Sequence, residues 1–349
     1  MQDDNPAEAS VPRAVFSVND IPARERYEVW KESISCIFDV DADVETRRED
    51  FFAAVDASMF GPIMLARSTS RGQRWRRSSS TIARDGMDHY MIQLYETGGQ
   101  TLNAGGIEVE QPVGGLLVYD LSRTVAARSG TFTNLSLIIP RGLLAEALVA
   151  PDDRHMQTLP ATGPMVAMLR DHMLSLTRLS PRMTAAQAAA MVPATVALTA
   201  ACLNTSGPDG PATGNGVAFV SMLAARRLID SRLSDENLTP DWLARRLGMS
   251  RAKLYRMFEP VGGIAQYIRD RRLRRAMLEL RDEPTRHLPI YEIALRAGFS
   301  SETTFGRAFR QRYGVTPRDV RYRGAPARHG AADDGPDRRY EEWLHHLAV

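Results

Sequence analysis

Hydrophobic and polar positions follow two different periods in the first half of the chain. From residue 23 to about 54, apolar residues recur at helical spacing and predict helix. Between residues 60 and 139 the pattern changes to short alternating or β-branched runs, separated by Gly-Gly pairs at intervals of seven to nine residues. This spacing of runs and turns predicts a small antiparallel β-barrel of the cupin or jelly-roll kind.

The pattern after the barrel predicts further helices and a domain boundary. Two stretches with apolar stripes, 164–179 and 181–203, are expected to be helices that either cover the barrel or form a dimer interface. The segment 205–216 is rich in Gly and Pro and lacks apolar periodicity, which is typical of a linker. We therefore expect a barrel domain over 1–204, a linker over 205–216, a second domain over 217–323 and a flexible C-terminal tail over 324–349.

The second domain contains one local pattern twice. Residues 243–250 and 293–300 each form a predicted short helix that ends at Gly, followed by an apolar residue and a Ser able to cap a further helix. This is the pattern of a helix-turn-helix, whose second helix enters the DNA major groove. A connecting helix is expected over 264–280. The fold class is therefore α+β: an antiparallel barrel with flanking helices, then an all-α domain of two helix-turn-helix units.

The outward positions of the two second helices carry side chains that can bond to base edges. Arg can bond guanine, Thr can contact the thymine methyl group, and Glu can accept from cytosine. The candidates for base recognition are Lys253, Tyr255, Arg256, Glu302, Thr303 and Arg307. Other basic residues are expected to contact phosphate, which adds affinity without sequence information. These phosphate candidates are Arg251, Arg272, Arg275 and Arg310, and the alternative for each is a solvated surface charge.

Charge is distributed unevenly between the two domains. The whole chain holds 44 Lys and Arg against 42 Asp and Glu, whereas residues 217–323 hold 22 of the former and only 12 of the latter. A basic module joined to an acidic body predicts that only the module contacts nucleic acid. A solvated basic face without a partner is the alternative.

Residues 217–323 resemble the C-terminal domain of the AraC/XylS family of bacterial transcription regulators. The resemblance rests on Ile293-Ala294, Gly298-Phe299-Ser300, Phe305, Phe309, Tyr313-Gly314, Thr316-Pro317 and the segment 267–276. It implies two helix-turn-helix units that recognise adjacent major grooves, and it also places Ala252 among the base-contacting positions. The segment 259–263 departs from the family, which usually has a basic residue there.

The barrel domain resembles, more loosely, a barrel-type sensor domain found in the same family. This resemblance implies a small-molecule effector, for which an organic acid is one candidate, and regulators of this kind often dimerise. The candidate effector-binding residues are Arg74, Trp75, Arg84, His89 and Tyr90. Here the arginines would bind a carboxylate of the effector, and the aromatic rings would form the walls of the pocket. The alternative is that the arginines lie in a solvated loop at the edge of a sheet.

Several classes of protein are excluded by what the sequence lacks. Two cysteines and seven scattered histidines do not provide a metal cluster, and no nucleophile elbow, P-loop or dinucleotide motif occurs. We therefore expect no enzyme, metal or cofactor. The polar, acidic start and the lack of eighteen consecutive apolar residues predict a cytoplasmic protein without a membrane span.

The sequence thus predicts a transcription regulator, an activator, that binds double-stranded promoter DNA and works with RNA polymerase. A homodimer is an option that the sequence leaves open. The alternative function is that of an architectural DNA-binding protein of low specificity, whose barrel serves only protein contacts.

Overall fold

The chain divides into two compact units. The computed structural model describes residues 9–48, 51–104, 107–111, 113–205, 216–285, 287–323 and 335–347. One unit, here called the β unit, comprises Met1–Gly207 and Arg328–Val349, and the other, the helical unit, comprises Pro208–Ala327. The predicted linker over 205–216 lies, apart from its two end residues, outside the described residues.

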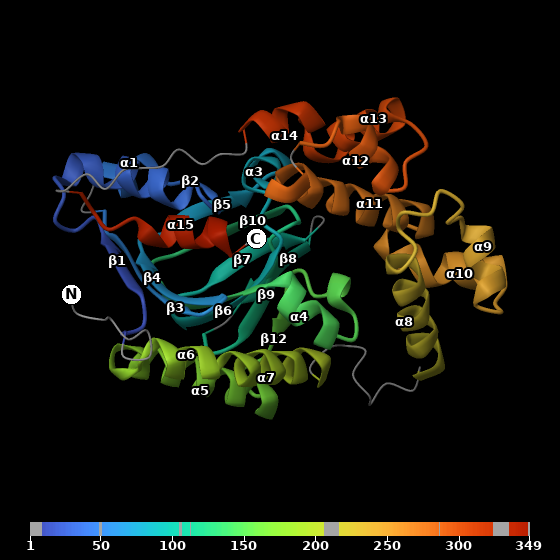
Figure 1. Cartoon of the computed structure of the whole chain (residues 1–349). Coiled ribbons are helices and arrows are strands. Elements are labelled where there is room, and N and C mark those ends of the chain that lie inside the picture. Colours follow the sequence, from blue (N-terminus) through green and yellow to red (C-terminus); the bar gives the residue numbers. More distant parts are fainter. Residues whose placement is uncertain are drawn as a thin grey trace, which may run out of the picture. The chain divides into compact units, whose positions relative to one another are not determined.

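Two sheets form the centre of the β unit (Figure 1). The larger has the order β1 (Arg13–Ser17), β3 (Ala53–Phe60), β4 (Ile63–Ser70), β11 (Phe132–Pro140), β6 (His89–Thr97), β9 (Leu116–Asp120) and β12 (Gln157–Leu159). The smaller has the order β2 (Asp39–Asp41), β5 (Gln73–Arg77), β10 (Val125–Ser129), β7 (Gln100–Ala104) and β8 (Ile107–Gln111). Each of these neighbouring pairs is antiparallel, so the predicted antiparallel β domain is confirmed.

The seven-stranded sheet is buried on both faces. Along β6, Tyr90, Ile92 and Leu94 belong to one apolar cluster, while Met91 belongs to the other. Successive side chains of a strand point to opposite faces, so these two clusters lie on the two sides of the sheet. Burial on both sides explains why the central strands are almost continuously apolar instead of alternating with polar residues.

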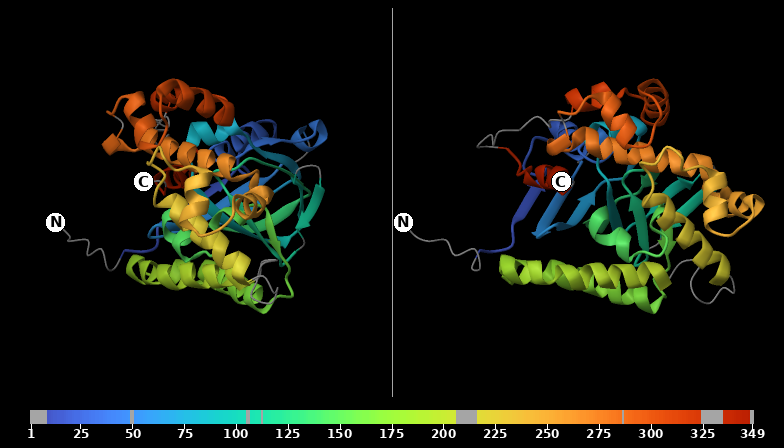
Figure 2. Two further views of the ribbon diagram at one scale, coloured as in Figure 1. Left: turned by 90° about the vertical axis from the view of Figure 1, so that its right-hand side faces the viewer. Right: turned by 45° about the vertical axis from the view of Figure 1, so that its right-hand side comes forward.

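Helices cover one face of this sheet (Figures 1 and 2). The helices of the β unit are α1 (Ala23–Ile34), α2 (Val44–Arg48), α3 (Ser79–Asp85), α4 (Arg141–Leu144), η1 (Ala145–Ala147), η2 (Pro151–Asp153), α5 (Pro164–Leu179), η3 (Ser180–Arg182), α6 (Ala185–Ala190), α7 (Val192–Thr205) and α15 (Arg339–His346). Apolar residues of α5 and α7, including Leu169, Met173 and Leu203, pack with Ile92 and Leu94 of the sheet. The predicted helices after the barrel therefore cover it.

The segment Ala185–Thr205 is long and apolar enough to cross a membrane by length and composition. A core helix that covers a sheet passes the same test. In this structure Val192, Thr199 and Leu203 of the segment are buried, and Val192 and Leu203 belong to the cluster on the sheet.

The structure differs from the predictions at both ends of the β unit. The region 23–54 is only partly helical, because it contains β2, which pairs with β5, and the start of β3. The predicted flexible tail is wrong for Arg339–His346, which forms α15. Its Tyr340 and Leu344 are buried in the core of the β unit, so this part of the chain is held by apolar packing. Residues 324–334 lie outside the described residues.

The helical unit confirms the predicted all-α fold. Its elements are α8 (Gly216–Asp230), α9 (Pro240–Arg246), α10 (Arg251–Phe258), η4 (Glu259–Val261), α11 (Ile264–Arg281), η5 (Glu283–Thr285), α12 (Ile290–Arg296), α13 (Glu302–Tyr313) and α14 (Pro317–Arg323). Helix α11 is the predicted connecting helix, and it separates the pair α9–α10 from the pair α12–α13.

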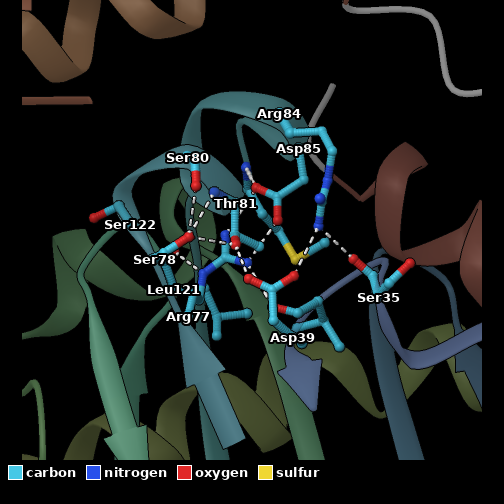
Figure 3. A network of polar contacts seen from close by, with 12 residues as sticks. Ser35, Asp39, Arg77, Ser78, Ser80, Thr81, Arg84, Asp85, Leu121 and Ser122 are labelled. Carbon is cyan, nitrogen blue, oxygen red and sulfur yellow. Dashed lines mark hydrogen bonds and ion pairs between the residues drawn. The ribbon is translucent and has the colours of Figure 1, made fainter. Parts of the chain in front are cut away.

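A fully buried ion pair fastens the five-stranded sheet to the loops around it (Figure 3). Arg77 on β5 contacts both carboxylate oxygens of Asp85 at 2.6 and 2.8 Å. Its guanidinium also donates to the carbonyl oxygens of Ile37 and Leu121. Asp85 in turn accepts from the backbone N–H of Met87 at 2.9 Å. The pair therefore joins four segments that are distant in sequence.

We predict that Asp85→Ala destabilises the β unit by about 3–5 kcal/mol, because it leaves the Arg77 guanidinium buried without its counter-charge. The measurement is the free energy of unfolding of the full chain in urea. Asp43→Ala is the matched control, since Asp43 pairs with Arg74 at an exposed position, and it should change stability little. Equal effects of the two substitutions would show that burial of the Arg77 pair does not matter.

Candidate nucleic-acid interface

Each pair of short helices in the helical unit has the geometry of a helix-turn-helix. Helix α9 begins after Thr239, whose side chain accepts from the N–H of Trp242, and Pro240 occupies its first turn. Ser250 caps α10 in the same way through the N–H of Lys253. In the second pair the cap of α13 is Ser301, one residue later than the predicted Ser300, and it accepts from Thr304.

The second helix of each pair is anchored by apolar residues on one side and exposed on the other. In α10 the buried residues are Leu254 and Phe258, and in α13 they are Phe305, Phe309 and Tyr313. All six predicted base-recognition residues are exposed, namely Lys253, Tyr255 and Arg256 on α10 and Glu302, Thr303 and Arg307 on α13. The chain thus presents three candidate side chains from each of two equivalent helices.

Gly298 sits where the backbone of the second turn passes close to another segment. Its φ is +85°, and a Cβ atom there would lie 2.2 Å from the carbonyl oxygen of Leu233 and 2.7 Å from Nε of Arg272. Arg272 reaches into the same place from α11 and donates to the carbonyl oxygens of Leu233 and Asp235 at 3.0 and 2.6 Å. Burial lowers the pKa of the Arg272 guanidinium. These contacts favour a structural role for Arg272 over the predicted phosphate contact.

The other three phosphate candidates differ in the contacts that their guanidinium groups make within the chain. Arg275 bonds to Glu279 at 3.1 Å and to Ser234 at 2.7 Å. Arg251 pairs with Asp241 at 2.7 Å, although its side chain remains 65% exposed. Arg310 is exposed on α13. Among the four, Arg251 and Arg310 are thus the most accessible to a phosphate.

A cleft of about 330 Å³ lies in the helical unit beside the first turn of α13. Its wall includes Thr239 and Pro240 at the start of α9, Arg269 on α11, and Phe299 and Thr304. Arg269 is exposed and was not among the predicted contact residues. The sequence could not distinguish it from the other arginines of α11, because only the folded unit shows which of them border the cleft.

The five candidate effector residues do not form one site. Arg74 is exposed and pairs with Asp41 and Asp43, while the next residue, Trp75, packs in the core between the sheets. Neighbouring positions on one strand point to opposite faces, so these two side chains cannot line one pocket. The other three are also separated: Arg84 donates to the Ser35 carbonyl, His89 is buried, and Tyr90 faces the helices and donates to the Pro151 carbonyl.

The core between the two sheets contains a cluster of neutral polar side chains that the sequence analysis missed. Gln100 donates to Gln93 at 2.8 Å and to Gln111 at 2.6 Å, and Gln93 donates to Ser136 at 3.2 Å. All four residues are buried. The sequence does show these glutamines within the predicted strand region 60–139. However, the pairing of the strands was needed to show that they lie together.

Burial favours the uncharged forms of three titratable groups in the β unit. Burial lowers the pKa of His89 and raises the pKa of Tyr95 and Tyr119. Within the described part of the chain, no group of three His, Cys, Asp or Glu residues is arranged to hold a metal ion.

Two family models match the chain. A helix-turn-helix domain model matches residues 243–323, and an AraC-binding-like domain model matches residues 32–204. The regulatory protein SoxS of Salmonella typhimurium is 42% identical over 91 residues, which span 26% of this chain and 82% of SoxS. The right origin-binding protein of Escherichia coli is 40% identical over 94 residues, spanning 26% of this chain and 31% of that protein.

One solved structure shows a similar fold over three quarters of the chain. The crystal structure of the AraC-like transcriptional activator CuxR matches with a TM-score of 0.53 at 24% sequence identity. The match covers 75% of this chain and 94% of that one. The likeness supports the arrangement of a β unit followed by a helical unit.

We predict that Gly298→Ala destabilises the helical unit more than Gly248→Ala does. Both glycines have positive φ, at 85° and 63°, so each alanine costs about 1–2 kcal/mol of backbone strain. Only Gly298 also lacks space for a Cβ atom, since no atom lies within 4 Å of the corresponding position at Gly248. Hydrogen exchange of α11 and α13 amides in the full chain measures the difference. Equal exchange in both variants would contradict the close approach at Gly298.

Proposed function

The chain belongs to the AraC/XylS family of transcription regulators, and from this premise we propose how its two units share the work. It is a DNA-binding transcription regulator with an N-terminal domain of the ligand-binding type. The family consists of transcription regulators and not of enzymes. The single observation that carries the proposal is the repeated helix-turn-helix, with an exposed polar face on both α10 and α13.

We propose that α10 and α13 enter two successive major grooves on one side of promoter DNA. Arg307 would bond a guanine edge, while Glu302 and Thr303 would contact neighbouring bases. On α10, Lys253, Tyr255 and Arg256 would have the same task. Arg251, Arg310 and Arg269 would contact phosphate. Arg269 was not among the predicted residues, and its exposed position at the cleft supports its inclusion.

For the β unit we propose that a small-molecule effector binds in the core between the two sheets. The neutral cluster around Gln93, Gln100 and Gln111 can exchange its internal hydrogen bonds for bonds to a ligand. The aromatic rings of Trp75 and Phe132 pack against each other with their centroids 5.6 Å apart, and they provide an apolar wall. This chemistry fits an uncharged, hydrogen-bonding effector better than the organic acid expected from the sequence.

The remaining parts of the proposal concern partners and location. The regulator would act as an activator in the cytoplasm, in contact with RNA polymerase at the promoter, without catalytic activity of its own. A homodimer would place four recognition helices on one promoter. The outer face of α6 and α7 supports this option, since the segment Ala185–Thr205 contains no charged residue.

We predict that Arg307→Ala weakens binding to specific DNA by about 1–3 kcal/mol and leaves binding to random DNA nearly unchanged. Specific fragments are first selected from genomic DNA by the full chain. Affinity for a selected fragment and for a random duplex of the same length is then measured by fluorescence anisotropy at several salt concentrations.

Arg310→Ala is the matched control, because Arg310 is exposed on the same helix three residues further along. A phosphate contact predicts that this variant loses affinity for both duplexes alike and that its salt dependence decreases by about one ion. If Arg307→Ala also weakened both duplexes equally, base recognition by Arg307 would be rejected. If the unaltered chain selected no fragments, the architectural alternative would be favoured.

A further inference from the structure

The C-terminal helix α15 occupies an aromatic groove in the β unit. Its buried residues are Tyr340 and Leu344, and the next buried residue, Leu347, is the C-cap of the helix. Spacings of four and three residues place all three on one side. The Tyr340 ring contacts Phe16 of β1 with ring centroids 5.9 Å apart, and Phe16 contacts Trp30 of α1 at 6.1 Å. Figure 1 shows α15 along the side of the sheet that carries β1, close to α1. The groove is thus formed by β1 and α1 and filled by α15.

Polar contacts also fix α15 against α1. Ser33 of α1, which is fully buried, bonds to the hydroxyl of Tyr340 at 2.6 Å and donates to Glu341. Burial raises the pKa of Tyr340 well above its ordinary value, so the hydroxyl stays protonated in this contact. Apolar packing and directed hydrogen bonds therefore specify one position for the helix.

The segment before α15 protects the free edge of the larger sheet. Strand β1 is an edge strand, so some of its backbone groups have no partner strand. Asp337 accepts from the backbone N–H of Val15 at 3.2 Å, and Arg339 donates to the carbonyl oxygen of Arg13 at 2.7 Å. Asp337 and Arg339 also pair with each other at 2.7 Å. The tail thus supplies the bonds that another strand would otherwise make.

The aromatic groove is continuous with the core between the sheets. From Phe16 and Trp30 the ring contacts run on to Trp75 at 6.4 Å, then to Phe132 at 5.6 Å and to Tyr95 at 5.5 Å. Tyr95 lies on β6, the strand that also carries Gln93. A change in ring packing at one end of this row can therefore be transmitted to the other end through direct ring contacts.

Docking of α15 connects the helical unit to the β unit at both of its ends. Ten residues separate Thr205 from Gly216, and eleven separate Arg323 from Gly335. While α15 is docked, the helical unit is therefore joined through both of its ends to the β unit, which is net acidic.

We propose that α15 is a releasable segment of the chain, bound in cis by a helix-binding groove of the β unit, and that its release strengthens DNA binding. The docked helix keeps an acidic body tied by two connections to a unit that binds a polyanion. Release leaves one connection, so the acidic unit can move away from the phosphates and the repulsion decreases. At low salt this repulsion extends over about 30 Å, and it is screened as salt is added.

The test compares full-length Leu344→Ala, which removes a buried side chain from the groove, with Glu342→Ala, which alters an exposed position on the same helix. We expect Leu344→Ala to bind a random duplex at least about fivefold more tightly at low salt, the lower end of ordinary coupling between sites. The gain should shrink as salt is added, and Glu342→Ala should behave like the unaltered chain. Hydrogen exchange over 340–347 reports whether the groove is empty.

A synthetic peptide of residues 335–349 distinguishes the effect of filling the groove from the effect of the second connection between the two units. Added to Leu344→Ala, it should restore the thermal stability of the β unit but not the weaker DNA binding, because the chain stays tied at one end only. An empty groove with unchanged DNA affinity would overturn the proposal. In the unaltered chain, exchange of the α15 amides together with the strands of the sheet would also overturn it, since the helix would then not be released separately. If no variant bound any duplex, the DNA-binding function itself would fail, while the peptide and exchange results would still decide whether α15 is releasable.

Discussion

The seven-stranded sheet must be covered on both faces, and the rest of the β unit follows from this requirement. Helices α5 and α7 cover one face. The other face needs three separate parts of the chain, namely the five-stranded sheet, α1 and α15. A sheet buried on both sides has central strands with little polar character, so any uncovered part would expose apolar surface to water. The C-terminal segment therefore belongs to this core although the helical unit precedes it in the sequence.

The sequence was sufficient where the determining contacts are local. Gly248 and Gly298 mark both helix-turn-helix turns, and Ser250 caps α10 as predicted, while the cap of α13 is Ser301, one residue after the predicted Ser300. Prediction failed where the partner is distant. Strand β2 looked helical because its pairing with β5 cannot be seen locally, and the apolar stripe of α15 does not reveal which groove it fills. Arg74 and Trp75 were predicted to line one pocket. Since neighbouring residues of a strand point to opposite faces, the sequence alone argues against this.

Net charge overstates the number of cations that the helical unit offers to DNA. On α11, Arg271 pairs with Asp230 at 2.9 Å, Arg272 bonds to two backbone carbonyls, and Arg275 bonds to Glu279. These arginines tie α11 to the segments around it and have fewer donors left for phosphate. The exposed cations that remain include Arg251 on α10, Arg310 on α13 and Arg269 on α11. Because α10 and α13 also carry the proposed base-recognition residues, their relative placement by α11 is decisive.

The arrangement of the aromatic core gives regulation a physical route that does not require contact between an effector and DNA. A ligand among the glutamines would lie beside β6, which carries both Gln93 and Tyr95, and the row of ring contacts that begins at Tyr95 ends at Tyr340. If the ligand binds more tightly to one packing of these rings, it shifts the free energy of docking α15. Docking of α15 then shifts the binding free energy of the ligand by the same amount. Such coupling needs only two alternative packings of a continuous core. The tail is well placed for this, since it is the part of the core attached to the helical unit and is held by few buried side chains.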